Sequence, residues 1–234
     1  MMVSASLGRS RLHRLLSDWS SPPAAGAVTD AAQLWASWLQ PLQAVQLQAG
    51  LDAVQAAVVA PPQPPDVAVV RGFQQEADRI RAAWQRAVDP AELAPDDPAA
   101  IAAVEARWPG HAALSGFDRY RRVHLEWQRQ MAAMVDPLRA QVRRAWARAG
   151  GRWQRLATLD VLVESLLQAP DARAMAQLPA WLQARYDHWM DGGLPADAAI
   201  AHFFADWQAL VDAELALRLQ PVQGLLDDCS QDKL

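Results

Sequence analysis

The sequence predicts an all-α protein, a mostly antiparallel bundle of seven or eight helices around one long kinked central helix. Alanine is abundant and runs of β-branched residues are nearly absent, which favours helix because alanine loses no side-chain entropy on helix formation. Apolar residues recur at helical spacing, and prolines and glycines fall between the periodic stretches. At 234 residues the chain can bury a substantial core.

The stretch from Phe117 to Arg155 carries the longest helical pattern. Its apolar residues are three or four positions apart and so share one face of a helix; they are Tyr120, His124, Trp127, Met131, Met134, Leu138, Val142 and Ala145. Pro137 lies inside this pattern without shifting its phase, which favours one kinked helix over two. Gly150 and Gly151 end the helix, so the predicted rod spans residues 117–149.

Shorter periodic stretches predict the remaining helices. They cover about residues 7–19, 29–54, 67–88, 97–108, 153–168, 171–190 and 196–219. Pro41 should kink the second of these or divide it after Leu39, because proline removes a backbone donor. Pro179 is a second candidate kink, and the residues at 191–195 form a clear stop before the last helix.

Prolines and charge divide the chain into four parts. The prolines at 61, 62, 64 and 65 form an extended hinge. The predicted parts are an N-terminal helical segment at 1–60, the proline-rich hinge at 61–66, the main helical bundle at 67–219 and an acidic, frayed tail at 220–234.

Charge is distributed unevenly along the chain. Residues 118–155 contain ten arginines and three acidic residues, whereas residues 187–234 contain nine acidic residues against Arg218 and Lys233. The arginines either pair with the acidic C-terminal helix or bind an external anion, and the matched charges favour internal pairing or a protein partner over nucleic acid. The candidate residues for an interaction or for phosphate contacts are Arg119, Arg122, Arg129, Arg139, Arg143, Arg144 and Arg148.

A second candidate surface lies near the amino terminus. Residues 31–51 of the second predicted helix carry no charge and are rich in glutamine, which is typical of contact with another surface or of a solvated neutral face. The side chains proposed for docking are Trp35, Trp38, Leu42, Arg11 and Arg14.

Motifs for catalysis are missing from the sequence. It has no glycine-rich phosphate loop and no serine in a nucleophile-elbow context. His188, His202 and Asp206 form the best metal constellation, but the Glu-x-x-His pair of carboxylate-bridged metal bundles is absent and ordinary packing is favoured. His124 is expected to be a hydrogen-bonded core residue. The sequence therefore predicts no catalytic residue, metal or cofactor; a metal-dependent hydrolase or nuclease near His188 and His202 is the least favoured alternative.

The sequence also predicts a cytoplasmic protein without a transmembrane segment. Its amino terminus lacks the apolar run of a signal peptide. Residues 31–51 are uncharged but contain five glutamines besides Pro41, which are costly in hydrocarbon. Cys229 is the one cysteine, so no intrachain disulfide can form and a reducing compartment is expected.

Three stretches resemble a bacterial family catalogued as domain of unknown function 3348. They are Ser10–Leu16 (SRLHRLL), the segment from Trp38-Leu39 through Ala44–Leu47 to Leu51-Asp52, and Phe117–Leu166, which is the most regular block. Pro41 and Gly50 depart from the family pattern, which predicts a break in the second helix.

The resemblance implies a genomic context and no assigned chemistry. Genes of this family often neighbour those of flagellar-stator-like proton channels and of OmpA-type peptidoglycan-binding proteins, a grouping similar to the Zorya class of anti-phage defence. We therefore expect a non-enzymatic cytosolic accessory or interaction subunit of a stator-like membrane complex, located at the inner face of the inner membrane, with protein partners. The alternative is a nucleic-acid-binding protein that uses the arginine-rich face of the central helix.

Overall fold

The computed structural model describes residues 11–20, 41–57, 60–85, 87–88, 98–107, 109–110, 114 and 116–230. In these ranges the chain forms seven helices and no strand, which confirms the predicted all-α fold. The helices are α1 (Arg11–Ser20), α3 (Pro41–Ala56), α4 (Val67–Trp84), α6 (Pro98–Arg107), α7 (Asp118–Ala149), α8 (Gly151–Asp191) and α9 (Ala196–Ser230). Among the described helices, none is long and apolar enough to cross a membrane.

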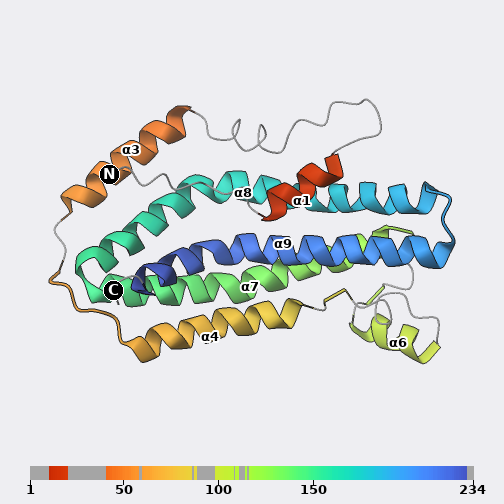
Figure 1. Cartoon of the computed structure of the whole chain (residues 1–234), viewed down its shortest axis with the longest axis horizontal. Coiled ribbons are helices and arrows are strands. Elements are labelled where there is room, and N and C mark those ends of the chain that lie inside the picture. Colours follow the sequence, from red (N-terminus) through yellow and green to blue (C-terminus); the bar gives the residue numbers. More distant parts are fainter. Residues whose placement is uncertain are drawn as a thin grey trace.

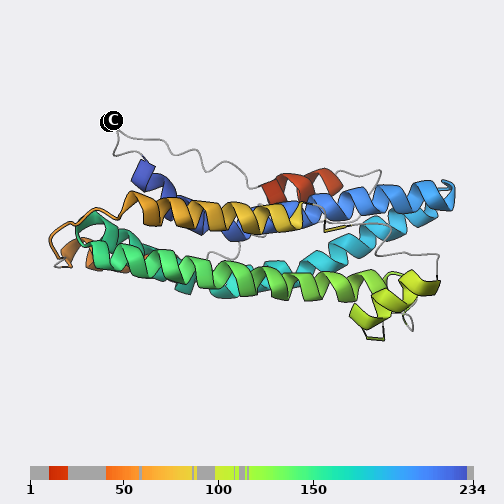
Figure 2. The same ribbon diagram turned by 90° about the horizontal axis from the view of Figure 1, so that it is seen from below.

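Three long helices, α7, α8 and α9, run up and down the molecule and pack against one another (Figure 1). α4 lies along α7 and α9, α1 packs on α9, and α3 packs on α8. α6 lies beside the start of α7 (Figure 2). The core is formed mainly where α7 and α9 face each other, and its largest fully buried side chains include Trp146, Trp207 and Phe203.

Most of the predicted apolar face of α7 is buried, namely Tyr120, His124, Trp127, Met131, Leu138 and Val142. Met134 and Ala145 of the same face are half-buried and pack against the core. The helix continues through Pro137, as predicted. It ends at Gly150 and Gly151, whose φ angles of 64° and 51° lie in the left-handed region that favours glycine. A Cβ at Gly150 would lie 2.5 Å from the carbonyl oxygen of Pro61, so the predicted hinge passes directly over this corner.

Two helix boundaries predicted from proline are wrong. α8 is one helix from Gly151 to Asp191 rather than two, because it continues through Pro170 and Pro179. α9 does not end at Leu219 but continues through Pro221 to Ser230. A proline removes one helical hydrogen bond, but apolar residues on either side of each proline remain in register with the core. The residues predicted to begin a frayed tail are therefore helical, and Val222, Leu225 and Leu226 are buried.

The amino-terminal helices rest on the bundle. α1 buries Leu12 and Leu16. α3 begins at Pro41, where a proline is tolerated because the first helical N–H has no partner, and it continues through Gly50. The predicted break at Gly50 is therefore wrong; a Cβ there would overlap the Leu162 side chain of α8, so the glycine permits close approach. The division of the chain at the prolines stays a prediction.

Candidate interaction surface

Arg139 and Arg143 of α7 are held by two acidic residues of α8. The Asp160 carboxylate lies 2.7 Å from the Arg139 guanidinium and 2.6 Å from that of Arg143. Glu164 closes the cluster at 3.1 Å from Arg139 and 2.7 Å from Arg143. The Asp160 side chain is only 9% exposed. These arginines pair within the chain, but the predicted pairing with the acidic C-terminal helix is wrong.

The turn between α7 and α8 explains this pairing. α7 and α8 form an antiparallel pair joined at the Gly150 corner, so residues at similar distances from the corner face each other. Asp160 and Glu164 are also one helical turn apart, as are Arg139 and Arg143, which places each pair on one face. The spacing of these four residues relative to the glycine corner can be read from the sequence, but the total charges of the segments do not reveal it.

Three acidic residues of α9 pair with arginines outside α7. The pairs are Asp206 with Arg185 at 2.7 Å, Asp212 with Arg11 at 3.7 Å, and Glu214 with Arg218 at 2.6 Å. The Trp189 indole also donates to Asp206 at 2.7 Å. These three carboxylates are therefore matched by arginines of α1, α8 and α9 itself rather than by the arginines of α7.

Reversing the two paired arginines should destabilise the fold. Arg139→Glu with Arg143→Glu would place two glutamates against Asp160 and Glu164, in a site where the arginine side chains are 15% and 20% exposed. We expect the free energy of unfolding to fall by about 1–3 kcal/mol, measured by urea denaturation. Arg144→Glu, at an exposed position on the same helix, is the matched control and should have little effect. Equal effects of the two changes would contradict this assignment.

A buried polar cluster joins α7, α8 and α9. His124 and Glu214 are fully buried. The Trp207 indole donates to Nδ1 of His124 at 3.2 Å, which confirms the predicted hydrogen-bonded core histidine. Because Nδ1 accepts, the neutral ring carries its proton on Nε2, which faces Glu214 at 3.6 Å. Gln128 extends the cluster by donating to the Met175 carbonyl of α8 at 3.1 Å.

The surroundings of this cluster shift two pKa values in opposite directions. Burial, together with the nearby positive charge of Arg218, lowers the pKa of His124 to about 4. Burial raises the pKa of Glu214, and Arg218 opposes that change. Protonating His124 at Nδ1 would place two donors against each other at the Trp207 contact. We therefore assign the cluster a structural role.

Acid should destabilise the fold through His124. The unfolded chain takes up this proton near the ordinary pKa of 6.5, whereas the folded chain does so only near 4. The free energy of unfolding should therefore fall across that window by up to about 3 kcal/mol. His124→Gln keeps an acceptor for Trp207 and removes the titration, so urea denaturation across the window should give the variant a shallower loss. The raised pKa of Glu214 makes its protonation stabilise the folded state as pH falls, and this holds in the wild type and in the variant. The difference between the two denaturation series therefore reports the titration of His124. Parallel curves would contradict the expectation.

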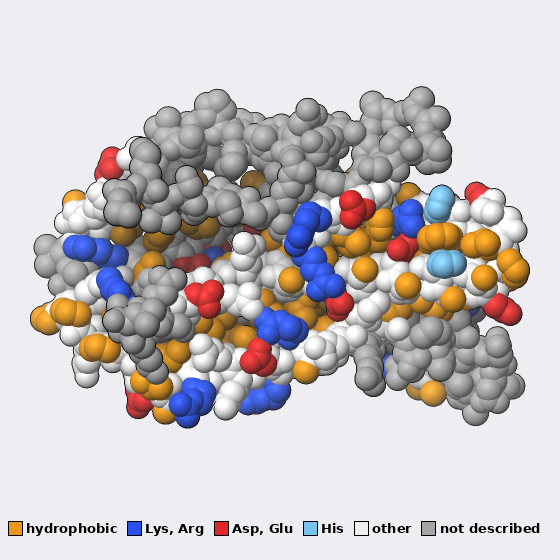
Figure 3. All heavy atoms as spheres, in the orientation of Figure 1, with side chains coloured by type: hydrophobic (Ala, Val, Ile, Leu, Met, Phe, Trp, Pro, Cys, Tyr) orange, Lys and Arg blue, Asp and Glu red, His pale blue; other side chains and the backbone are white. Residues whose placement is uncertain are grey.

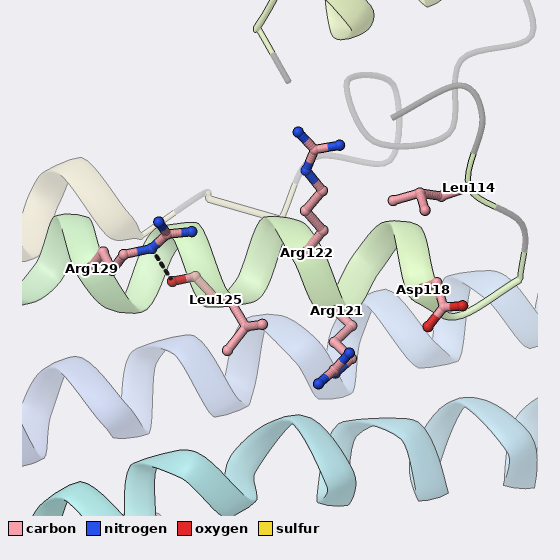
Figure 4. A pocket seen from close by; sticks show the side chains of 6 residues that line it. All are labelled: Leu114, Asp118, Arg121, Arg122, Leu125 and Arg129. Carbon is pink, nitrogen blue, oxygen red and sulfur yellow. Dashed lines mark hydrogen bonds between the residues drawn. The ribbon is translucent and has the colours of Figure 1, made fainter. Parts of the chain in front are cut away.

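Exposed arginines gather at the amino-terminal half of α7, beside α6. A shallow hollow of about 380 Å³ is lined by Leu114, Asp118, Arg121, Arg122, Leu125 and Arg129 (Figure 4). A second, of about 330 Å³, is lined by Arg107, Pro109, Arg122, Glu126, Arg129 and Gln130. Arg122 and Arg129 line both. We call these two hollows together the arginine surface.

The arginine surface is only partly neutralised within the described part of the chain. Arg129 pairs with Glu126 at 3.0 Å and donates to the Leu125 carbonyl at 3.4 Å, the contact dashed in Figure 4. Arg121 and Arg122 are exposed and form no ion pair with a described residue. Figure 4 shows Arg122 and Arg121 leaving α7 on opposite sides. Arg122 and Arg129 were predicted from the sequence, whereas Arg121 and Arg107 were not, because the sequence does not show where α6 packs.

The other predicted arginines lie outside this surface. Arg119 is half-buried, with its guanidinium carbon 5.9 Å from the centre of the Tyr120 ring. Arg144 and Arg148 are exposed nearer the other end of α7. The seven predicted arginines therefore do not form one surface, and only two of them line the hollows.

The predicted amino-terminal docking surface is described only in part. Arg11 pairs with Asp212, and Arg14 is exposed. Trp35 and Trp38 lie outside the described residues, as does the side chain of Leu42. The proposed docking role of these residues stays a prediction.

His188 and His202 both contact Trp189 at the end of the molecule where α8 turns into α9. The His202 ring stacks on the indole, with centroids 4.5 Å apart, and His188 meets it at 4.9 Å. Figure 3 shows the pale blue histidines on either side of apolar surface. Across the described ranges, no group of three or more His, Cys, Asp or Glu side chains is placed to hold a metal ion.

Comparison with known proteins gives one match. A family model described as "Protein of unknown function (DUF3348)" matches residues 2–231, which is nearly the whole sequence. No curated protein and no solved structure matches the chain.

Proposed function

Because this chain belongs to the DUF3348 family, we propose that it is a non-enzymatic interaction subunit that binds a protein partner through the arginine surface. The partner proposed from the family resemblance is a stator-like membrane complex in anti-phage defence. On this proposal the protein works in the cytoplasm, at the inner face of the inner membrane.

The observation that carries the proposal is the uneven neutralisation of the arginines. Arg139 and Arg143 are matched by acidic residues of α8, whereas Arg121 and Arg122 remain exposed without an ion pair to a described residue. The hollows they line are shallow and lie on the outside of the bundle. An open charged surface suits recognition of another macromolecule better than enclosure of a small substrate.

The buried polar cluster supports a non-enzymatic role. His124 and Glu214 are the titratable residues with the strongest burial, but both side chains are fully covered. A general acid or base must lie within hydrogen-bond reach of a substrate. Trp207 and Arg218 occupy the positions beside these two groups that a substrate would need.

Nucleic-acid binding is the second candidate, because the exposed arginines include Arg121, Arg122, Arg144 and Arg148 along one helix. However, Arg139 and Arg143 in the middle of this run are engaged with α8. The basic track is therefore interrupted, and fewer phosphates could be neutralised together. Sub-micromolar binding of duplex DNA with steep salt dependence would favour this candidate over a protein partner.

Deletion of the gene from its native cluster tests the proposed biological role. We expect the deletion strain to lose protection against at least part of a broad phage panel, and we expect the wild-type gene supplied in trans to restore it. Unchanged plaquing across the panel would reject a role in defence. The same test on a neighbouring gene of the cluster verifies that the cluster protects under the conditions used.

A further inference from the structure

We infer that the arginine surface binds an acidic α-helix of a protein partner, with carboxylates spaced two turns apart. The inference rests on the proposed function, because it specifies the partner of an interaction subunit. It is carried by the spacing of the arginines, by the apolar residues between them, and by the modest net charge of the surface.

The spacing follows from the helix. Arg122 and Arg129 are seven residues apart on α7, so they lie on one face about 10 Å apart along the axis. Residues seven apart on a partner helix alongside α7 have the same spacing. Guanidinium groups bind carboxylates through paired hydrogen bonds, so each arginine can hold one acidic side chain. Arg121 lines the same hollow as Arg122 and could hold a further carboxylate.

Apolar residues lie between the charges. Leu125 is half-buried and stands between Arg122 and Arg129 in sequence, and half-buried Leu114 lines the same hollow. A leucine-sized side chain between two acidic residues of the partner could pack on Leu125. Amphipathic helices present alternating apolar and charged side chains of this kind. A nucleic-acid backbone presents only a sugar between successive phosphates and no leucine-sized aliphatic side chain.

The net charge favours carboxylates over a polyanion. Four arginines and two acidic residues, Asp118 and Glu126, line the two hollows. A phosphate chain would approach those two carboxylates as well as the arginines. A helix with isolated acidic residues can instead place each one on an arginine and keep neutral residues elsewhere.

The test measures binding of a defined peptide. The probe is a fluorescent helical peptide with pairs of glutamates seven residues apart and leucines between them, and its control carries glutamine in place of glutamate. We expect fluorescence anisotropy to show binding of the glutamate peptide, weakened by salt, and at least about tenfold weaker binding of the glutamine peptide. Comparable binding of both peptides, no binding of either, or preferred binding of duplex DNA would overturn the inference.

Two charge-reversal variants locate the site. Arg122→Glu with Arg129→Glu should weaken binding of the glutamate peptide at least about tenfold. Arg144→Glu with Arg148→Glu changes the net charge equally on the same helix, outside the hollows, and should bind nearly as the wild type does. All four side chains are exposed, so both variants should keep the wild-type melting temperature. Arg122→Gln with Arg129→Gln provides a milder change should the reversal alter the fold. Equal loss in both reversal variants would overturn the assignment of the site.

The peptide-binding assay tests the binding site and the phage challenge tests the defence role, so either result can be negative without the other. Peptide binding without phage protection would leave the binding site standing and remove the defence role. Phage protection without peptide binding would leave the accessory role standing and overturn the acidic-helix partner. Concentration-dependent self-association that Arg122→Glu with Arg129→Glu abolishes would instead identify the occupant as a second copy of this chain and would also overturn it.

Discussion

Replacing Arg218 by leucine is expected to lower the free energy of unfolding by about 3–5 kcal/mol. Glu214 is fully buried, and the Arg218 guanidinium holds its carboxylate through contacts of 3.0 and 2.6 Å. Without Arg218 the carboxylate would be buried without a countercharge, since Gln128 offers only a neutral donor at 3.4 Å. Urea denaturation at neutral pH measures the loss directly.

Two controls separate this cause from a general loss of packing. Changing Glu214 to leucine together with Arg218 should recover much of the stability, because it removes the unpaired charge. The stability deficit of the single variant relative to the wild type should also narrow as pH falls. Its Glu214 pKa would rise above the already raised native value, so the folded state would bind this proton more tightly than the unfolded state. A double variant as unstable as the single variant would contradict this explanation.

Replacing Trp207 by alanine is expected to cost about 3–5 kcal/mol. Trp207 is fully buried, and its ring centre lies 4.9 Å from that of Trp127 and 5.6 Å from that of Tyr120. Its loss would leave a cavity between α7 and α9 and remove the donor to His124. Chemical denaturation should show a lower midpoint with a similar slope.

Trp207→Phe separates the two contributions. Phenylalanine keeps most of the ring contacts but leaves Nδ1 of His124 without its donor, which should cost about 1–3 kcal/mol. We therefore expect its stability to lie between those of the wild type and the alanine variant. A phenylalanine variant as stable as the wild type would show that the hydrogen bond contributes little.

The sequence predicted the central helix well because its apolar pattern is long and regular. Met131, Leu138 and Val142 are buried where the spacing placed them, and the helix ends at the two glycines. Local rules for proline failed in α8, because packing of the flanking turns outweighs one missing hydrogen bond. Helix ends near proline therefore depend on tertiary contacts that the sequence pattern does not contain.

The candidate surface was predicted only in part. The total charge of residues 118–155 indicated an arginine-rich region. Which arginines form ion pairs depends on the residues that face them, and the corner between α7 and α8 determines those neighbours. The sequence predicted an acidic C-terminal helix, but it did not indicate that Glu214 of this helix is fully buried, since glutamate seldom is. The sequence features that accompany its burial are Arg218, one turn later, and the apolar neighbours Ala213 and Leu215, which are also buried.

Isolation of the tagged protein from cells that express the native gene cluster tests the central claim most directly. The proposed function predicts that the membrane proteins of a stator-like complex co-purify with the wild type and with Arg144→Glu plus Arg148→Glu. It predicts their loss with Arg122→Glu plus Arg129→Glu, at equal expression and melting temperature. Recovery of the same membrane proteins with all three forms, or with none of them, would contradict an interaction subunit that works through the arginine surface.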